Sequence, residues 1–180
     1  AIFGVEAALL DLADPRKMPN QKLPAIQTDG QLIHDSDNIR SHLEGLGAEF
    51  DPGLSDMEKA TSRAFIRMAE EHMYFHIVAD RWCNAAVWPV IRETYFDSIP
   101  KLLRKLITNK LRKSVIQGTQ FQGLGRWSDE ERLARLEPDL QAILTRLWLG
   151  AYLFGDRPTA ADASVAAMLT RTIPRPAHTA

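Results

Sequence analysis

The 180-residue chain has little cysteine, no long apolar run and almost no net charge, and each shortage excludes a class of protein. Cys83 is the single cysteine, so no internal disulfide can form and nothing points to an oxidising compartment. No apolar stretch approaches the roughly 20 residues of a membrane-spanning helix, and no basic-then-apolar leader opens the chain. The formal net charge of -1 supplies no field that would attract nucleic acid. These shortages predict a globular, cytoplasmic protein without a nucleic-acid partner.

Strand and helix patterns alternate in the first fifty residues. Residues 23–27 alternate in side-chain character as a short strand does, and Asp29-Gly30 is a hairpin turn signal before the returning strand at 32–33. Ser36 then stands where an N-cap residue would open the next helix. The pattern predicts a hairpin followed directly by a helix.

A linker divides the chain near residue 50. Residues 47–54 hold two glycines and a proline between periodic segments, which indicates a boundary between domains at 1–48 and 54–180. Beyond it nearly every segment has helical periodicity, so we expect an α+β chain that is mostly α. Along the first long helix one face is predicted to carry Ala60, Ala64, Met68, His72, Phe75 and Ala79.

Three helix starts have the pattern of a capping box, in which a hydroxyl residue and an acidic residue stand three apart. The pairs are Ser55 with Glu58, Ser128 with Glu131, and Thr159 with Asp162. For Thr159 and Asp162 this pattern predicts a structural role, with the Asp162 carboxylate bonded to the Thr159 amide.

Two segments resemble glutathione transferases. Residues 23–44 (LPAIQTDGQLIHDSDNIRSHLE) resemble the second half of their thioredoxin-like domain, and residues 154–169 (FGDRPTAADASVAAML) resemble the capping-box helix buried in their helical domain. The intervening stretches GLSDMEKATSRAFIRMAEEHMYF, RWCNAAVWP and FQGLGRWSDEE are similar to the branch of failed axon connections proteins and metaxins. The resemblance implies a partial thioredoxin-like α/β domain, then an all-helical glutathione-transferase C-terminal domain, in a homodimer.

The same resemblance implies a glutathione site in the first domain. Leu23 matches the residue whose backbone pairs with the cysteinyl unit, and Pro24 matches the cis-proline after it. Asp35 and Ser36 match the acidic-Ser pair that holds the γ-glutamyl end, with Lys22 nearby. Physically, a strand edge can pair with a peptide and a helix N-terminus can hold a carboxylate. In the alternative interpretation Pro24 only shapes a turn and Ser36 only caps its own helix.

The implied reaction is attack of the glutathione thiolate on a small hydrophobic electrophile. The resemblance places that electrophile against the helical domain near Met68, His72 and Phe75. A second hypothesis is a non-catalytic binding or targeting module on the same fold.

The start of the chain departs from the family pattern. Residues 1–10 read as a helix, so the first strand and the Tyr, Ser or Cys that activates the thiol are missing from the sequence given. Residues also look to be missing between Leu10 and Asp14 and after Ala180, and Gln21 stands where many relatives have glycine. Catalysis is therefore assigned to no residue.

Four further features have a structural and a functional interpretation. His72 and His76 lie one turn apart, but without a third ligand we expect two part-buried histidines and no metal. Cys83 is expected to be buried and inert. The basic amphipathic segment 101–113 is expected to be a solvated face paired with Asp129, Glu130 and Glu131, and contact with a membrane surface is the less favoured alternative. Trp82, Trp88 and Trp127 are expected to fill the helical core or line a substrate cleft.

Overall fold

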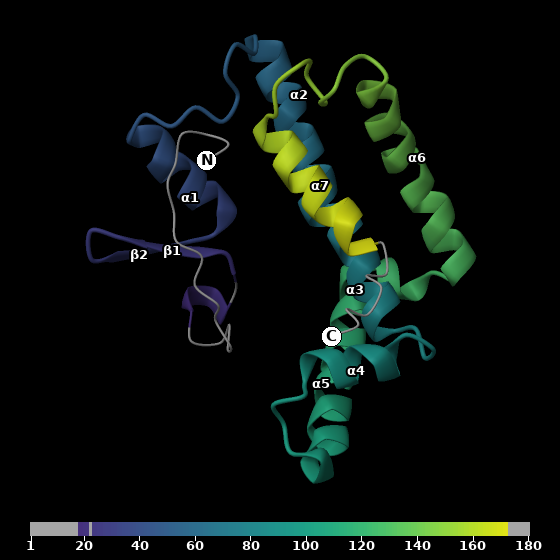
Figure 1. The fold of residues 1–180 in the computed structure, drawn as a ribbon. Helices are drawn as coiled ribbons and strands as arrows, with labels where there is room; N and C mark the ends of the chain where they lie inside the picture. Colours follow the sequence, from purple (N-terminus) through teal and green to yellow (C-terminus); the bar gives the residue numbers. More distant parts are fainter. Residues whose placement is uncertain (1–17, 22, 173–180) are drawn as a thin grey trace, which may run out of the picture. The chain divides into compact units, whose positions relative to one another are not determined.

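The computed structural model describes residues 18–21 and 23–172, and the chain divides into two compact units between Leu54 and Ser55. The first unit contains a short 3-10 turn, a two-stranded antiparallel hairpin and one helix (Figure 1). These elements are η2 (Pro19–Gln21), β1 (Ala25–Thr28), β2 (Gln31–His34) and α1 (Ser36–Gly45). The helix predicted over residues 1–10 lies outside the described residues.

The hairpin turns at Asp29 and Gly30, as the sequence predicted. Both residues have positive φ, 45° and 77°, which is the geometry of the tight two-residue turn that matches the twist of paired strands. The register pairs Ala25 with His34 and Thr28 with Gln31. It therefore brings the start of β1 beside the residues that open α1.

Asp35, and not Ser36, caps α1. Asp35 has φ 75° and ψ 135°, and its carboxylate accepts a hydrogen bond from Asp37 N–H at 3.1 Å. Ser36 is the first helical residue. The prediction that Ser36 is the N-cap is therefore wrong, because the positive φ at Asp35 starts the helix one residue earlier than the predicted cap implies.

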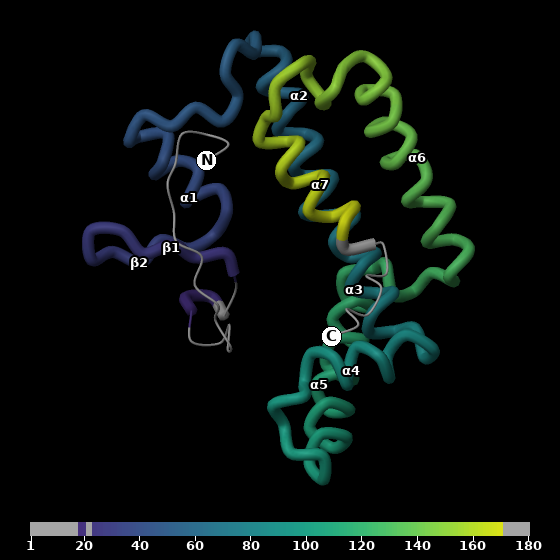
Figure 2. Tube along the Cα trace, viewed as in Figure 1, coloured from purple at the N-terminus to yellow at the C-terminus, as the bar shows by residue number. Residues whose placement is uncertain are grey.

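The second unit is a bundle of helices around one long broken helix. Its elements are α2 (Asp56–Arg67), the π-helical segment η3 (Met68–Met73), α3 (Tyr74–Trp82), α4 (Trp88–Tyr95), α5 (Lys101–Gln122), η4 (Leu124–Arg126), α6 (Asp129–Leu147) and α7 (Ala160–Thr172). Figure 1 shows α7 alongside α2, and Figure 2 shows the chain passing from α2 through η3 into α3 without a turn. Among the described residues, no helix is long and apolar enough to cross a membrane.

The buried face of the broken helix differs from the predicted one. Ile66, Ala69, Met73 and Ile77 are buried, whereas Ala60 and Ala64 are exposed. The π-helical segment changes the phase of the helix by widening it locally. This change is one reason that a strict 3.6-residue pattern drawn across residues 60–79 does not give the core face.

Two of the predicted capping boxes form in full. At the start of α2, the Ser55 hydroxyl accepts from Glu58 N–H and the Glu58 carboxylate accepts from Ser55 N–H. Ser128 and Glu131 form the same two bonds at the start of α6. Pro138 lies inside α6, which continues through it from Asp129 to Leu147.

Candidate functional site

The first candidate site begins at Leu23 and Pro24, whose peptide bond is cis. Leu23 is half exposed, and its backbone N–H and C=O have no hydrogen bond to another described residue. The carbonyl of Pro24 accepts from Asp35 N–H at 3.2 Å. That bond holds the free backbone of Leu23 next to the first residues of α1.

At the start of α1, Ser36 presents donors without partners in the described part of the chain. Its amide is one of the first N–H groups of the helix, which have no intrahelical acceptor, and its hydroxyl makes no hydrogen bond there. The helix dipole adds a partial positive charge at this end. The pair of donors is therefore suited to a carboxylate.

Asp35 adds a negatively charged acceptor next to the two donors of Ser36. One carboxylate oxygen holds Asp37 N–H, and the residue is exposed, so the carboxylate is open to a cation from the solvent side. A simple anion such as phosphate would meet the repulsion of this carboxylate. A zwitterion, with carboxylate and ammonium on one carbon, fits both groups.

The remaining neighbours stabilise this arrangement. Asn38 donates to the carbonyl of His34 at 3.1 Å, and Asn20 lies 3.4 Å from His34 Nδ1, which links η2 to the end of β2. Arg40 bonds Asp51 at 2.7 Å and so fastens the segment after α1 to the helix. Lys22, predicted to lie near the ligand, is outside the described residues.

The second candidate region lies on the broken helix of the other unit. Met68, His72 and Phe75 are half buried there. Both ring nitrogens of His72 already have partners. Nδ1 lies 2.5 Å from the Asp139 carboxylate on α6, and Nε2 lies 3.3 Å from Nε2 of His76. No sequence pattern points to Asp139, which is 67 residues from His72 along the chain.

This arrangement of Asp139, His72 and His76 keeps one imidazole neutral. Burial is the largest cause of a pKa of about 4 for His76, below its ordinary 6.5; the nearby His72 also lowers this pKa, and Asp139 acts in the opposite direction. His76 is buried at 7% exposure, so the neutral ring is the form that suits its surroundings. Among the described residues no group of three His, Cys, Asp or Glu side chains is placed to hold a metal ion.

Thr159 and Asp162 form a buried junction at the start of α7. The Asp162 carboxylate accepts from Thr159 N–H at 2.8 Å, from Thr159 Oγ1 at 2.7 Å and from Leu153 N–H at 2.8 Å. Thr159 and Leu153 are each 2% exposed. The geometry fits the predicted structural role, and the bond to Leu153 was not foreseen.

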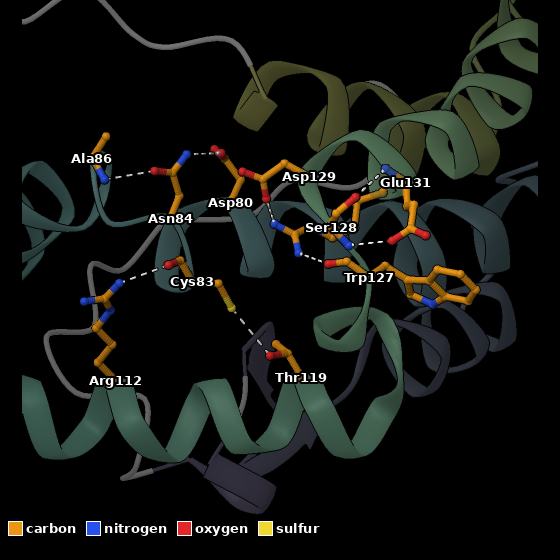
Figure 3. A network of polar contacts seen from close by, with 11 residues as sticks. Asp80, Cys83, Asn84, Ala86, Arg112, Thr119, Trp127, Ser128, Asp129 and Glu131 are labelled. Carbon is orange, nitrogen blue, oxygen red and sulfur yellow. Dashed lines mark hydrogen bonds and ion pairs between the residues drawn. The ribbon is translucent and has the colours of Figure 1, made fainter.

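The lone cysteine and the tryptophans are arranged around the end of α3. Cys83 is half buried rather than buried, with Sγ 3.6 Å from Thr119 Oγ1 (Figure 3). Trp82 and Trp88 stack with ring centroids 5.1 Å apart, and Trp88 is buried. Trp127 is 43% exposed beneath the Arg135 guanidinium, so it does not fill the core.

Comparison with known proteins defines the class to which these two units belong. A model of the glutathione S-transferase N-terminal domain matches residues 3–87, and a model of the C-terminal domain matches residues 121–179. The chain is thus a thioredoxin-like N-terminal domain followed by a helical C-terminal domain, as the sequence predicted. The two matches leave residues 88–120 between them, which hold α4 and most of α5.

Individual relatives place the chain within that class. It is 30% identical over 168 residues to the isoprene-epoxide glutathione S-transferase of Rhodococcus sp. (strain AD45), covering 88% of this chain and 68% of that protein. It is 29% identical over 172 residues to metaxin-1 of Mus musculus and 23% identical over 148 residues to metaxin-2 of Homo sapiens. Those matches cover 90% and 82% of this chain but 54% and 56% of the metaxins. No solved structure matches.

The chain belongs to the glutathione S-transferase family, on the branch that includes the metaxins.

Proposed function

We propose that this protein binds glutathione at the junction of Leu23, Pro24, Asp35 and Ser36 and transfers it to a small hydrophobic electrophile. The observation that carries the proposal is a pair of donors on Ser36 that have no partner among the described residues. The bond from Asp35 N–H to Pro24 holds them beside the backbone of Leu23, which likewise makes no hydrogen bond to another described residue. Membership of the glutathione S-transferase family supports the same ligand.

The γ-glutamyl and cysteinyl units of glutathione each have a counterpart in this arrangement. The γ-glutamyl carboxylate takes the amide and hydroxyl of Ser36, and the neighbouring ammonium takes the carboxylate of Asp35. The backbone of the cysteinyl unit pairs with the N–H and C=O of Leu23, as an added strand would. The tripeptide is thereby fixed at its charged end and along its backbone, which leaves the sulfur free to react.

In the proposed reaction the thiolate sulfur forms a bond to an electrophilic carbon of the second substrate. The name of the Rhodococcus relative favours an epoxide as that substrate. The C–O bond of the ring breaks as the S–C bond forms, its electron pair stays on the oxygen, and that oxygen takes a proton from water. We further expect a cytoplasmic homodimer.

Calorimetry with glutathione tests the binding site. Ser36→Ala removes one hydrogen bond to a charged group and is expected to weaken binding about tenfold or more. Ser41→Ala, an exposed serine on the same helix, is the matched control and is expected to bind as the original chain does. A folded protein that gives no heat with millimolar glutathione would end the proposal.

Asp35→Asn separates the two tasks of Asp35. Asparagine caps a helix as well as aspartate does and tolerates positive φ, so helix stability should be kept. Its missing charge should still weaken glutathione binding by about tenfold, on the scale of a charge-assisted bond. Equal binding by both proteins would place the ligand ammonium elsewhere.

Turnover distinguishes a transferase from a binding module on the same fold. Loss of a small epoxide in the presence of glutathione, with the thioether formed in equal amount, is the result expected of a transferase. Binding without thioether formation supports the module instead, and sedimentation of the same sample gives the number of subunits.

A further inference from the structure

Helix α5 buries three polar side chains and exposes six large apolar ones. Arg104, Thr108 and Thr119 are buried, at 8%, 0% and 2% exposure. By contrast, Leu102 is 96% exposed and Phe121 is 90% exposed. The other apolar residues that the helix exposes are Leu103, Leu106, Ile107 and Leu111. The usual direction of an amphipathic helix, with the apolar side toward the core, is reversed here.

The polar inner side fixes this rotation. Arg104 bonds the Glu93 carboxylate at 2.6 Å and the carbonyls of Asp97 and Ile99 at 2.7 and 3.0 Å. Further along, Arg112 bonds the carbonyl of Cys83 at 3.0 Å (Figure 3). It also bonds the carbonyl of Trp82 at 2.7 Å. Because these buried groups have their partners, turning the apolar side inward would break them at a cost that a few leucines would not offset.

The outer side carries cations among its apolar groups. Leu103, Leu106, Lys110, Lys113 and Phe121 follow one another at intervals of three, four, three and eight residues, which keeps them on one side of a helix. Residues 101–122 contain no Asp or Glu. We call this side the α5 outer face.

The lysines of the α5 outer face have no acidic partners within the described chain. No ion pair joins Lys110 or Lys113 to a described carboxylate. The expected pairing with the acidic start of α6 is wrong, because Asp129 pairs with Arg132 and Glu131 closes its own capping box. The charges of this face are therefore uncompensated.

We propose that the α5 outer face lies on the surface of an anionic lipid bilayer, with its leucines and Phe121 between the headgroups and its lysines on the phosphates. Mixed lysine and large apolar side chains on one helical side are the chemistry of helices that lie in the interface. Lysine stems can rest on the apolar layer while their ammonium groups reach the headgroups.

Charge argues against a second copy of the chain as the occupant. A twofold contact centred on α5 would bring Lys110 and Lys113 against the same side chains of the other copy, with no carboxylate on either face. An anionic surface turns the same charges into attraction, worth about a fivefold gain in affinity for each lysine near the surface.

Vesicle sedimentation with the full chain tests the proposal. We expect binding to phosphatidylcholine vesicles that contain phosphatidylserine, weaker binding to pure phosphatidylcholine, and a decline as salt is raised. Lys110→Glu changes two units of charge and should weaken binding by about 25-fold on the fivefold-per-charge scale. Lys59→Glu, the same change at an exposed lysine on α2, should alter it less than about twofold.

Apolar insertion has its own variant. Leu106→Ser should weaken vesicle binding at low and at high salt alike, because the lost contact is not electrostatic. Circular dichroism shows whether each variant keeps its helices. Absence of binding to the anionic vesicles by the folded chain overturns the proposal. So does an α5 substitution that changes the sedimentation mass in solution and leaves vesicle binding unchanged, since the face would then bind protein.

Discussion

At Asp35 one side chain serves the fold and the proposed ligand at the same time. Its Oδ1 closes the first turn of α1 through Asp37 N–H, and its backbone N–H joins α1 to Pro24. The capping bond fixes the position of the carboxylate, and its remaining lone pairs can accept hydrogen bonds from the ligand. Removing the side chain altogether would therefore change helix capping and ligand binding at once. Asparagine keeps the cap and removes only the charge, so it is the informative substitution.

His76 makes the stability of the helical unit depend on pH. The folded protein holds this imidazole neutral down to about pH 4, whereas the unfolded chain takes up a proton near 6.5. The unfolded state therefore binds more protons between these values, so the free energy of unfolding falls as pH drops from 6.5 to 4. The loss from this one residue should be on the order of 2 kcal/mol.

His76→Gln keeps an N–H that can face His72 but cannot titrate. We expect the variant to show a shallower decline between pH 6.5 and 4 than the original chain. Urea unfolding followed by tryptophan fluorescence measures this, because Trp82, Trp88, Trp127 and Trp148 all belong to the helical unit. Parallel declines in the two proteins would contradict the assignment.

Among the elements, α5 shows how buried polar contacts can set the orientation of a helix. Arg104 and Lys105 are neighbours in sequence, yet the first is buried in four hydrogen bonds and the second is exposed. Removing the first charge would leave carbonyls and a carboxylate without their donor, and removing the second would leave nothing unpaired.

The pair Arg104→Met and Lys105→Met tests that orientation with a cation-to-methionine change at a buried position and at the exposed position next to it. Arg104→Met should lower the free energy of unfolding by about 2 to 4 kcal/mol, because it breaks a buried bonded charge. Lys105→Met should change it by less than about 0.5 kcal/mol. Urea unfolding gives both numbers, and similar losses for the two would mean that α5 is rotated differently.

What the sequence could predict of these elements follows from how local each signal is. The boxes at Ser55 and Ser128 and the turn at Asp29-Gly30 need residues within three positions of one another, and all three form. The rotation of α5 depends on carbonyls of Trp82 and Cys83, about 30 positions away. The prediction of a solvated face paired with α6 used only the pattern of residues along α5, and that pattern does not contain these distant contacts.

The candidate site was predictable to the same extent. Leu23, Pro24 and Ser36 were found through the family resemblance, and β1 and β2 bring them together by simple pairing. The cap at Asp35 was missed because Asp35 and Ser36 are both good capping residues, and the choice depends on a backbone angle. Asp139 was missed because no pattern links α6 to His72.

At the scale of the whole molecule, the two proposed ligands belong to different units. Glutathione is assigned to residues 23–36 of the first unit, and the lipid surface is assigned to α5 of the second. A ligand slows hydrogen exchange where it stabilises the local structure against opening. The two ligands should therefore leave separate patterns of protection on the same chain.

Hydrogen exchange measured by mass spectrometry can record both patterns. Glutathione should slow exchange in peptides that cover residues 23–38 and leave residues 101–122 unchanged, and anionic vesicles should do the reverse. Ser36→Ala should remove the first effect alone and Lys110→Glu the second alone. If Ser36→Ala also abolished the vesicle effect, the two units would be acting as one, and the assignment of a separate lipid-binding face to α5 would fail.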